Sequence, residues 1–197
     1  MRIFKTSFRI LKLGIVAVIC TLLVLSFTVR GFRVGSGSME PTLKTGDCVV
    51  LDRISYHIRE PERGEVIAFR FNPNQPENLT KGANFFVRAM DLMGEIMHVT
   101  HENTEYYVKR VIGLPGDHVE MRAGFIYING QPLDEQYSVI RDATDASFDV
   151  PEKNALVLGD NRPDSFDSRF WGFVPCDSIV GRAVAIYWPP SRAGSIK

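Results

Sequence analysis

The chain has 197 residues, of which 45% are hydrophobic, and its 23 basic side chains balance 23 acidic ones. This length and composition suit one globular domain with a small appendage and exclude a largely disordered chain. A net charge of zero argues against a nucleic-acid-binding protein, because such proteins usually carry a basic excess. The cysteines Cys20, Cys48 and Cys176 form no Cys-x-x-Cys motif, so free thiols are expected rather than a zinc or redox site.

An uncharged apolar segment at residues 13–29 predicts a transmembrane anchor. As a helix it would span about 25 Å, slightly less than a bilayer core, and Lys12 and Arg30 can extend to the interface. A cleaved signal peptide is the alternative, but no Ala-x-Ala-like site follows the segment. The sequence therefore favours an uncleaved anchor.

The distribution of basic residues around this segment predicts its orientation. Residues 1–12 contain four basic residues and no acidic one, whereas only Arg30 and Arg33 follow the segment closely. Positive residues concentrate on the cytoplasmic side of membrane segments. We therefore expect a cytoplasmic tail at 1–12 and an extracytoplasmic domain at 30–197, held at the cell membrane by a single span.

From Cys48 onward the sequence predicts a mainly β domain. Short runs of β-branched and aromatic residues are separated by turn signals rich in Gly, Pro and Asn. The expected strands are 48–52, 65–71, 106–112, 118–121, 125–128, 155–158 and 179–188. Asn129 and Gly130 suit a type I′ hairpin turn.

An insert at about 72–104 interrupts this β pattern. Its first part is rich in Pro and Asn, and residues 84–97 place Phe, Met, Leu and Ile at approximate helical spacing. We predict one amphipathic helix at 84–97. It would either pack on the β core or act at the membrane surface, and the sequence favours neither alternative.

Residues 34–47, Val-Gly-Ser-Gly-Ser-Met-Glu-Pro-Thr-Leu-Lys-Thr-Gly-Asp, follow the apolar segment closely. Gly35 and Gly37 widen the choice of backbone conformations around Ser36 and Ser38, and Pro41 restricts it again. Such a stretch can present a hydroxyl beside free backbone N–H groups. A Gly/Ser linker between membrane and domain is the plainer alternative.

Two further segments carry candidate chemistry. Strand alternation in 106–112 places Tyr107 and Lys109 on one face and Val108 and Arg110 on the other. An exposed lysine is the commoner outcome on a strand, but a buried one loses basicity and becomes a competent general base beside a serine. The second segment, 159–172, combines Arg, Asp and aromatic residues, a composition that suits either a surface loop or a network that holds a loop in place.

Together these segments resemble the type I signal peptidase family. Ser36-Gly-Ser-Met-Glu-Pro-Thr is similar to its nucleophile motif, and Gly46-Asp47 with the following apolar residues to its next box. Lys109-Arg-Val-Ile-Gly-Leu-Pro-Gly-Asp117 is similar to its lysine motif, and Gly159-Asp-Asn-Arg-x-x-Ser-x-Asp-Ser-Arg-x-x-Gly172 to its C-terminal motif. The motifs occur in the family's order between 34 and about 188. Gly35 departs from the Pro of many members, and the insert has no counterpart in the short members.

The resemblance implies a catalytic Ser-Lys dyad. Ser38 would be the nucleophile, Lys109 the general base, and the Ser38 N–H with the Ser36 hydroxyl the oxyanion hole. Ser165 would hydrogen-bond and orient Lys109. The surrounding loops would be held by four supporting residues, Asp160, Arg110, Asp167 and Arg169. Shallow pockets for small residues would be formed by Val34, Met39, Leu43, Tyr107 and Val108.

The implied protein is a monomeric, membrane-bound serine endopeptidase. It would cleave signal peptides from secretory preproteins after small residues at −1 and −3. It would associate with the lipid bilayer and would need no metal, cofactor or nucleic acid. Two alternatives stay open. One is a relative that uses the same chemistry on another target, such as a self-cleaving repressor or a conjugation-type processing protease. The other is an inactive membrane-anchored adaptor.

Overall fold

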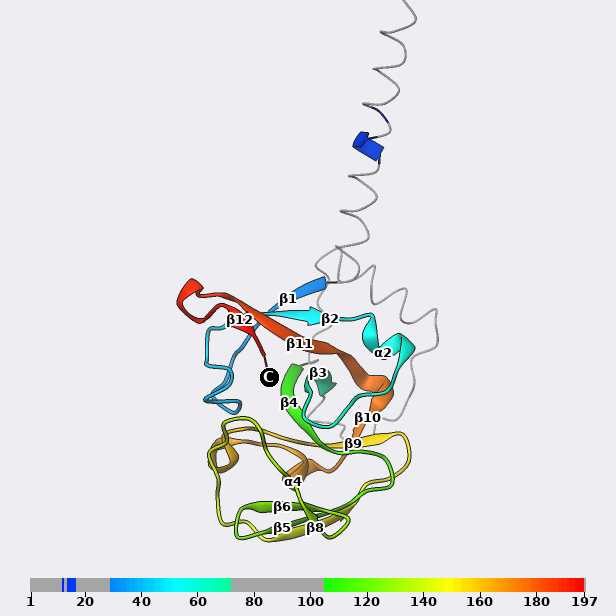
Figure 1. The fold of residues 1–197 in the computed structure, drawn as a ribbon, viewed down its shortest axis with the longest axis vertical. Coiled ribbons are helices and arrows are strands. Elements are labelled where there is room, and N and C mark those ends of the chain that lie inside the picture. The colour runs from blue at the N-terminus through cyan, green and yellow to red at the C-terminus, as the bar shows by residue number, and fades with distance from the viewer. Residues whose placement is uncertain (1–11, 13, 17–28, 72–104, 197) are drawn as a thin grey trace, which may run out of the picture.

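The computed structural model describes Lys12 and residues 14–16, 29–71 and 105–196 (Figure 1). The predicted insert at 72–104, its helix at 84–97 and most of the predicted anchor at 13–29 lie outside the described residues. Within the described ranges, no helix is long and apolar enough to span a bilayer.

The larger sheet has eight strands and forms the upper part of the domain in Figure 1. Its strand order is β1-β2-β11-β3-β4-β9-β10, β12 pairs with β11, and all these pairs are antiparallel. The strands are β1 (Val29–Arg33), β2 (Cys48–Asp52), β3 (Val66–Phe71), β4 (Glu105–Gly113), β9 (Asn154–Leu158), β10 (Val174–Pro175), β11 (Ile179–Trp188) and β12 (Gly194–Ser195).

The smaller sheet has four strands in the order β7-β6-β5-β8 and lies below the larger one in Figure 1. Its strands are β5 (His118–Arg122), β6 (Phe125–Ile128), β7 (Gln131–Pro132) and β8 (Ala146–Asp149). The Asn129–Gly130 turn joins β6 to β7, with φ of 52° and 80° at its two residues. Ala123 and Gly124, also at positive φ, join β5 to β6.

Short helices occupy the connections. They are α2 (Ser55–Ile58), α4 (Ser168–Trp171), and the 3₁₀ turns η2 (Arg162–Asp164), η3 (Cys176–Ser178) and η4 (Pro190–Arg192). The Asp167 side chain caps α4 by accepting a hydrogen bond from the Arg169 N–H, which satisfies a donor that the first helical turn leaves free. Cys48 and Cys176 are free, half-buried thiols.

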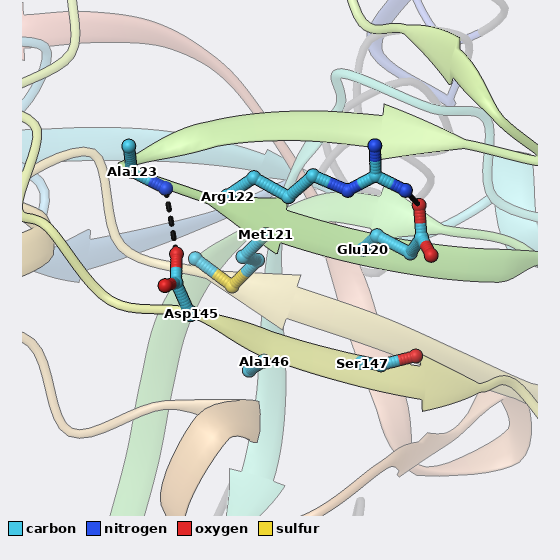
Figure 2. A pocket seen from close by; sticks show the side chains of 7 residues that line it. All are labelled: Glu120, Met121, Arg122, Ala123, Asp145, Ala146 and Ser147. Atoms are coloured by element: carbon cyan, nitrogen blue, oxygen red, sulfur yellow. Dashed lines mark hydrogen bonds and ion pairs between the residues drawn. The ribbon is translucent and has the colours of Figure 1, made fainter.

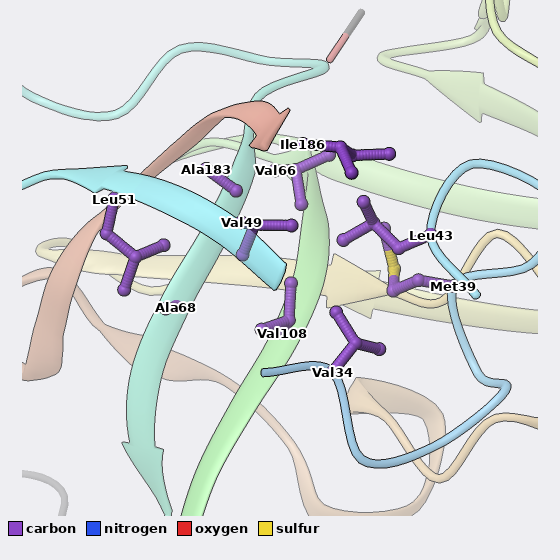
Figure 3. Close-up of a cluster of buried hydrophobic side chains, with 10 residues drawn as sticks. All are labelled: Val34, Met39, Leu43, Val49, Leu51, Val66, Ala68, Val108, Ala183 and Ile186. Atoms are coloured by element: carbon purple, nitrogen blue, oxygen red, sulfur yellow. The ribbon is translucent and has the colours of Figure 1, made fainter. Parts of the chain in front are cut away.

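Three apolar clusters form the core. The first joins β2, β3, β4 and β11 to the 34–47 loop (Figure 3), the second lies on the other face of β3 and β4, and the third joins the ends of β4 and β9 to the smaller sheet. Burial of large aliphatic side chains typically contributes about 1.5–3 kcal/mol each. Because Met39 and Leu43 belong to the first cluster, hydrophobic packing fixes the loop that carries both serines.

The prediction of a mainly β domain is confirmed, and each expected strand corresponds to one in the structure within a residue or two. The sequence prediction missed β1, β7, β8, β10 and β12. Four of these are at most four residues long or have a polar face, and β1 begins where the apolar segment ends.

Candidate active site

Ser38 lies in the 34–47 loop, whose two ends are hydrogen-bonded to each other. Val34 and Asp47 pair at its base, where the Val34 N–H donates to Asp47 O at 2.8 Å, and the Gly46 N–H donates to Val34 O at 2.9 Å. Within the loop, the Leu43 N–H donates to Met39 O at 2.9 Å. Ser38 is 7% exposed, so its hydroxyl is withdrawn from bulk water although it lies in a loop.

Lys109 reaches this serine from the middle of β4. Its Nζ atom donates a hydrogen bond to Ser38 Oγ at 2.6 Å, although the two residues lie 71 positions apart in the chain. Lys109 is 2% exposed and pairs with Ile67 of β3, and its Nζ lies 6.0 Å from the centre of the Tyr107 ring. The strand therefore presents a buried amine directly to a buried hydroxyl.

The surroundings of Lys109 make it less basic than an ordinary lysine. Desolvation by burial lowers its pKa to about 8, because the charged ammonium loses its hydration. The positive charge of Arg169 lowers the pKa further, while the carboxylates of Asp167, Asp160 and Asp164 oppose the shift. An appreciable fraction of the amine is consequently neutral close to physiological pH.

Ser36 lies beside the nucleophile candidate but on the solvent side. Its Oγ atom is 3.3 Å from Ser38 Oγ, and its side chain is exposed. The Ser36 hydroxyl thus lies between Ser38 Oγ and solvent.

Arg110, the next residue in β4, points to the opposite face and forms a bidentate pair with Asp160. Arg110 Nε donates to Asp160 Oδ1 at 2.8 Å and Nη2 donates to Oδ2 at 2.7 Å, with both side chains fully buried. The Thr42 hydroxyl donates to the same carboxylate at 2.5 Å, and the Tyr137 ring lies 3.8 Å from the guanidinium carbon. This network connects β4, the 34–47 loop and the loop after β9.

Asp167 and Arg169 hold the second half of the 159–172 loop. Asp167 Oδ2 accepts from the Gly159 N–H at 3.0 Å, and its Oδ1 accepts from Arg169 Nε at 2.8 Å. Arg169 also donates to Asp142 at 2.6 Å and to the carbonyl of Arg162 at 2.6 Å. The supporting residues expected from the sequence therefore form two ion pairs, Arg110–Asp160 and Asp167–Arg169.

Ser165 departs from its expected contact. Its Oγ atom is buried and has no hydrogen-bond partner among the residues that the structure describes, so the expected bond to Lys109 is not formed. The hydroxyl instead packs against Gly159, where an added Cβ would lie 2.2 Å from Ser165 Oγ and 2.4 Å from the Ser38 carbonyl oxygen. The role of Ser165 in orienting Lys109 stays a prediction.

Three site residues had no role in the sequence prediction, namely Thr42, Gly159 and Asn161. Asn161 Nδ2 donates to the Gly37 carbonyl at 3.2 Å, and its backbone N–H donates to the Ser38 carbonyl at 3.1 Å. The signal that could have drawn attention to Gly159 and Asn161 was their place in the motif that also holds Asp160.

The expected pocket residues fall on two faces of the sheet. Val34, Met39, Leu43 and Val108 are at most 8% exposed. All four belong to the first core cluster, whose side chains are drawn in Figure 3. Tyr107 lies on the other face, where its ring stacks on Phe69 at a centroid distance of 6.3 Å. The strand alternation that separates Tyr107 from Val108 is the same one that separates Lys109 from Arg110.

A surface pocket lies away from this site, on the smaller sheet (Figure 2). Its lining comes from β5, β8 and the segments next to them: Glu120, Met121, Arg122, Ala123, Asp145, Ala146 and Ser147. None of the expected site residues lines it. Among the described residues, no group of three or more His, Cys, Asp or Glu side chains is arranged to hold a metal ion.

In a comparison with known protein families, residues 7–188 match the family described as "Signal peptidase, peptidase S26". A probable signal peptidase I-2 of Synechocystis sp. is 38% identical over 184 residues, which cover 93% of this chain and 74% of that protein. A signal peptidase I of Leptolyngbya laminosa is 38% identical over 183 residues, 91% of this chain and 79% of that protein. A crystal structure of a signal peptidase I from Enterococcus faecalis aligns with a TM-score of 0.43 at 31% identity, covering 64% of this chain and 97% of that one.

Proposed function

The chain belongs to the signal peptidase family, peptidase S26, and on this basis we propose that it cleaves signal peptides from secretory preproteins with Ser38 and Lys109 as a catalytic dyad. The 2.6 Å contact between Lys109 Nζ and Ser38 Oγ is the single observation that carries the proposal. Burial of both groups supports it, because a desolvated amine with a pKa of about 8 can act as a base.

In the proposed reaction, Ser38 Oγ attacks the carbonyl carbon of the scissile peptide bond while neutral Lys109 accepts the hydroxyl proton. Collapse of the tetrahedral intermediate breaks the C–N bond, and Lys109 returns the proton to the leaving amine. Water then attacks the acyl-enzyme with Lys109 again as the base, which releases the signal peptide and restores Ser38. A nucleophile and a base within hydrogen-bond distance are the requirement for this covalent route.

The oxyanion of the intermediate would be stabilised by two donors on the nucleophile loop. These are the Ser38 N–H and the Ser36 hydroxyl, whose oxygen lies 3.3 Å from Ser38 Oγ. Donors that are held in place before the reaction stabilise charge that develops in the transition state without further reorganisation.

Substrate selection would rest on the apolar groups around the dyad. Met39, Leu43, Val34 and Val108 crowd one side of the nucleophile loop, and Tyr107 lies on the Lys109 side. Surfaces that are already closely packed leave room for small side chains only, which favours small residues at −1 and −3 of the substrate.

The chain would act at a membrane, with 13–29 as the anchor, 1–12 in the cytoplasm and 30–197 outside it. The uncharged run of the sequence and the basic residues that precede it support this arrangement. It would bring the dyad to the surface where the cleavage sites of secretory preproteins emerge, with the enzyme acting as a monomer and without a cofactor.

One assay tests the function. The full-length protein, purified in detergent, is given a precursor with Ala-x-Ala before its cleavage site, and the products are sized and sequenced. We expect a single cut after the second Ala by the wild type and none by Ser38→Ala. Cleavage by Ser38→Ala at the wild-type rate would contradict the catalytic role of Ser38 and Lys109. Failure of the wild type to cut would contradict the proposed substrate class.

A further inference from the structure

We propose that Asn161 is a positioning residue for the oxyanion hole, because it fixes the plane of the peptide bond between Gly37 and Ser38. The inference rests on the proposed function and assigns a role to a side chain that touches neither Ser38 Oγ nor Lys109. It concerns how the Ser38 N–H is aimed at the substrate.

Asn161 holds two consecutive carbonyl groups of the nucleophile loop. Its side-chain Nδ2 donates to Gly37 O at 3.2 Å, and its backbone N–H donates to Ser38 O at 3.1 Å. Gly37 O also accepts from the Glu40 N–H at 3.0 Å. The carbonyl of the peptide that precedes Ser38 is therefore held by two donors, one local and one from the loop after β9.

The Gly37 carbonyl and the Ser38 N–H belong to one rigid peptide unit. In a trans peptide these groups point in opposite directions, so a carbonyl that is fixed on one side fixes the direction of the N–H on the other. Gly37 has no side chain to restrict its backbone dihedrals, and rotation of this peptide plane is accordingly easy without external hydrogen bonds. Donors on the carbonyl also polarise the amide and strengthen its N–H as a donor.

The orientation of the Asn161 amide follows from its partner. Gly37 O can only accept a hydrogen bond, so the amide must present its NH2 group rather than its oxygen. Replacement by Asp keeps the shape and the backbone N–H but puts an acceptor against an acceptor. Asn161→Asp therefore removes the side-chain donor with little change in volume.

Asn161 is itself fixed by its neighbours, which makes it a firm support. The carbonyl of Asn161 accepts from the Asp164 N–H at 3.0 Å, and Asn161 forms a parallel bridge with Ile140. The adjacent Asp160 belongs to the buried pair with Arg110. The direction of the oxyanion donor is thus set in part by the segment that follows β9 and not by the glycine-containing loop alone.

Asn154 provides a matched control at the opposite end of β9. Its Nδ2 also donates to a backbone carbonyl, that of Glu152 at 2.9 Å, so Asn154→Asp breaks the same kind of bond away from the dyad. The side chain of Asn154 lies outside the catalytic network described above.

The experiment compares the full-length wild type with Asn161→Ala, Asn161→Asp and Asn154→Asp on a peptide with Ala at −1 and −3. Rates are measured at about pH 9.5, above the Lys109 pKa of about 8, so that a changed charge beside Lys109 does not alter the result. We expect kcat to fall by about 10- to 100-fold in both Asn161 variants, with KM unchanged, and to stay at the wild-type value in Asn154→Asp.

A second measurement separates positioning from general loosening of the fold. Ser38 Oγ adds to the carbonyl carbon of a peptide aldehyde, and the serine proton is transferred to the former carbonyl oxygen, which then occupies the oxyanion hole. The inhibition constant of a peptide ending in alaninal should rise by the factor by which kcat falls, since the adduct resembles the transition state. The inhibition constant of the product peptide, which ends in a carboxylate, should not change.

An undiminished kcat in Asn161→Asp, or a rise in KM alone, would overturn the role of Asn161. If Asn161→Ala does not fold, Asn161→Asp decides, since it keeps the size and the backbone hydrogen bond. Equal loss of affinity for the aldehyde and the product peptide would show a purely structural role. An inactive wild type, or an active Ser38→Ala, would instead contradict the proposed function.

Discussion

Arg110 and Asp160 form a fully buried, doubly hydrogen-bonded ion pair on the face of β4 opposite Lys109. The pair joins β4, which carries Lys109, to the loop after β9, and Thr42 of the 34–47 loop donates to the same carboxylate. Three segments distant in sequence thereby meet at one carboxylate, which makes its charge a structural requirement.

Removal of that charge should destabilise the domain strongly. Asp160→Asn leaves the Arg110 guanidinium buried without a counter-ion, and breaking one side of a buried pair typically costs about 3–5 kcal/mol. We expect Tm to fall by about 10 °C or more, measured by calorimetry or circular dichroism. Glu120→Gln, which breaks the exposed pair with Arg122, is the control and should change Tm little. A wild-type Tm in Asp160→Asn would show that the pair is dispensable.

The pH dependence of cleavage should follow the neutral fraction of Lys109. Burial lowers its pKa to about 8, and a base must be unprotonated to accept the serine proton. The value of kcat/KM should therefore rise about tenfold per pH unit below about pH 7 and reach a plateau above about pH 9. A profile that is flat between pH 6 and pH 9, at about constant protein stability, would rule out Lys109 as the base.

Lys109→Arg tests the same assignment without removing the positive charge. A guanidinium stays protonated throughout this pH range, so the variant should not cleave at any pH at which the fold survives. The serine and lysine act as one unit, and Ser38→Ala combined with Lys109→Ala should be no slower than either single variant. Near-normal turnover by Lys109→Ala would contradict the dyad.

Ser36→Ala should slow the chemical step without weakening substrate binding. Loss of one oxyanion donor typically lowers kcat by about 10²–10³-fold, and a group that acts only in the transition state leaves KM unchanged. Ser36→Thr retains a hydroxyl and should lose less. Steady-state kinetics on the Ala-x-Ala peptide provide the measurement, and full-rate turnover by Ser36→Ala would place the second donor elsewhere.

Gly159→Ala should impair catalysis because the added methyl group has no space. Its Cβ would lie 2.4 Å from the Ser38 carbonyl oxygen and 2.2 Å from Ser165 Oγ, both far inside normal contact distances. The backbone at Ser38 must shift, and a displacement of about 1 Å can cost about 100-fold in kcat. Gly194→Ala, at a position with nothing within 4 Å of the new methyl group, is the control and should behave as the wild type.

The orientation of the chain in the membrane can be tested by proteolysis. Protease added outside intact spheroplasts should digest the 30–197 domain and spare a tag at the N-terminus, as the basic residues before the apolar segment predict. If the domain is protected until the membrane is opened, it faces the cytoplasm. That result would contradict the proposed orientation and the proposed access to secretory precursors.

The sequence predicted most of the fold because strand alternation is a local property. The period of two in 106–112 placed Lys109 and Arg110 on opposite faces, which the structure confirms through their separate contacts. The pairing of Ser38 with Lys109 is not local, and only the resemblance to a family connected the two motifs. Asn161 and Thr42 lie in the motifs but were given no role, because their partners, a backbone carbonyl and a shared carboxylate, cannot be identified from the chain alone.

Ser165 lies in the motif that the resemblance identified, but the contact expected for it is not formed in the structure. The resemblance assigned it a hydrogen bond to Lys109, yet its hydroxyl rests against Gly159 without a partner among the described residues. A motif fixes which residues occupy a loop, whereas the direction of a single hydroxyl depends on packing that only the folded chain determines.

The adjacency of Lys109 and Arg110 has a consequence for how β4 can change during evolution. A slip of one residue in the pairing of β4 with β3 would move the guanidinium to the face that Lys109 occupies and the amine to the face that Arg110 occupies. Neither group can replace the other. The guanidinium stays protonated and cannot act as a base, and the amine cannot form two parallel hydrogen bonds to a carboxylate in one plane. We therefore expect an insertion or deletion of one residue before Lys109 within the β4 pairing to break both the contact with Ser38 and the pair with Asp160.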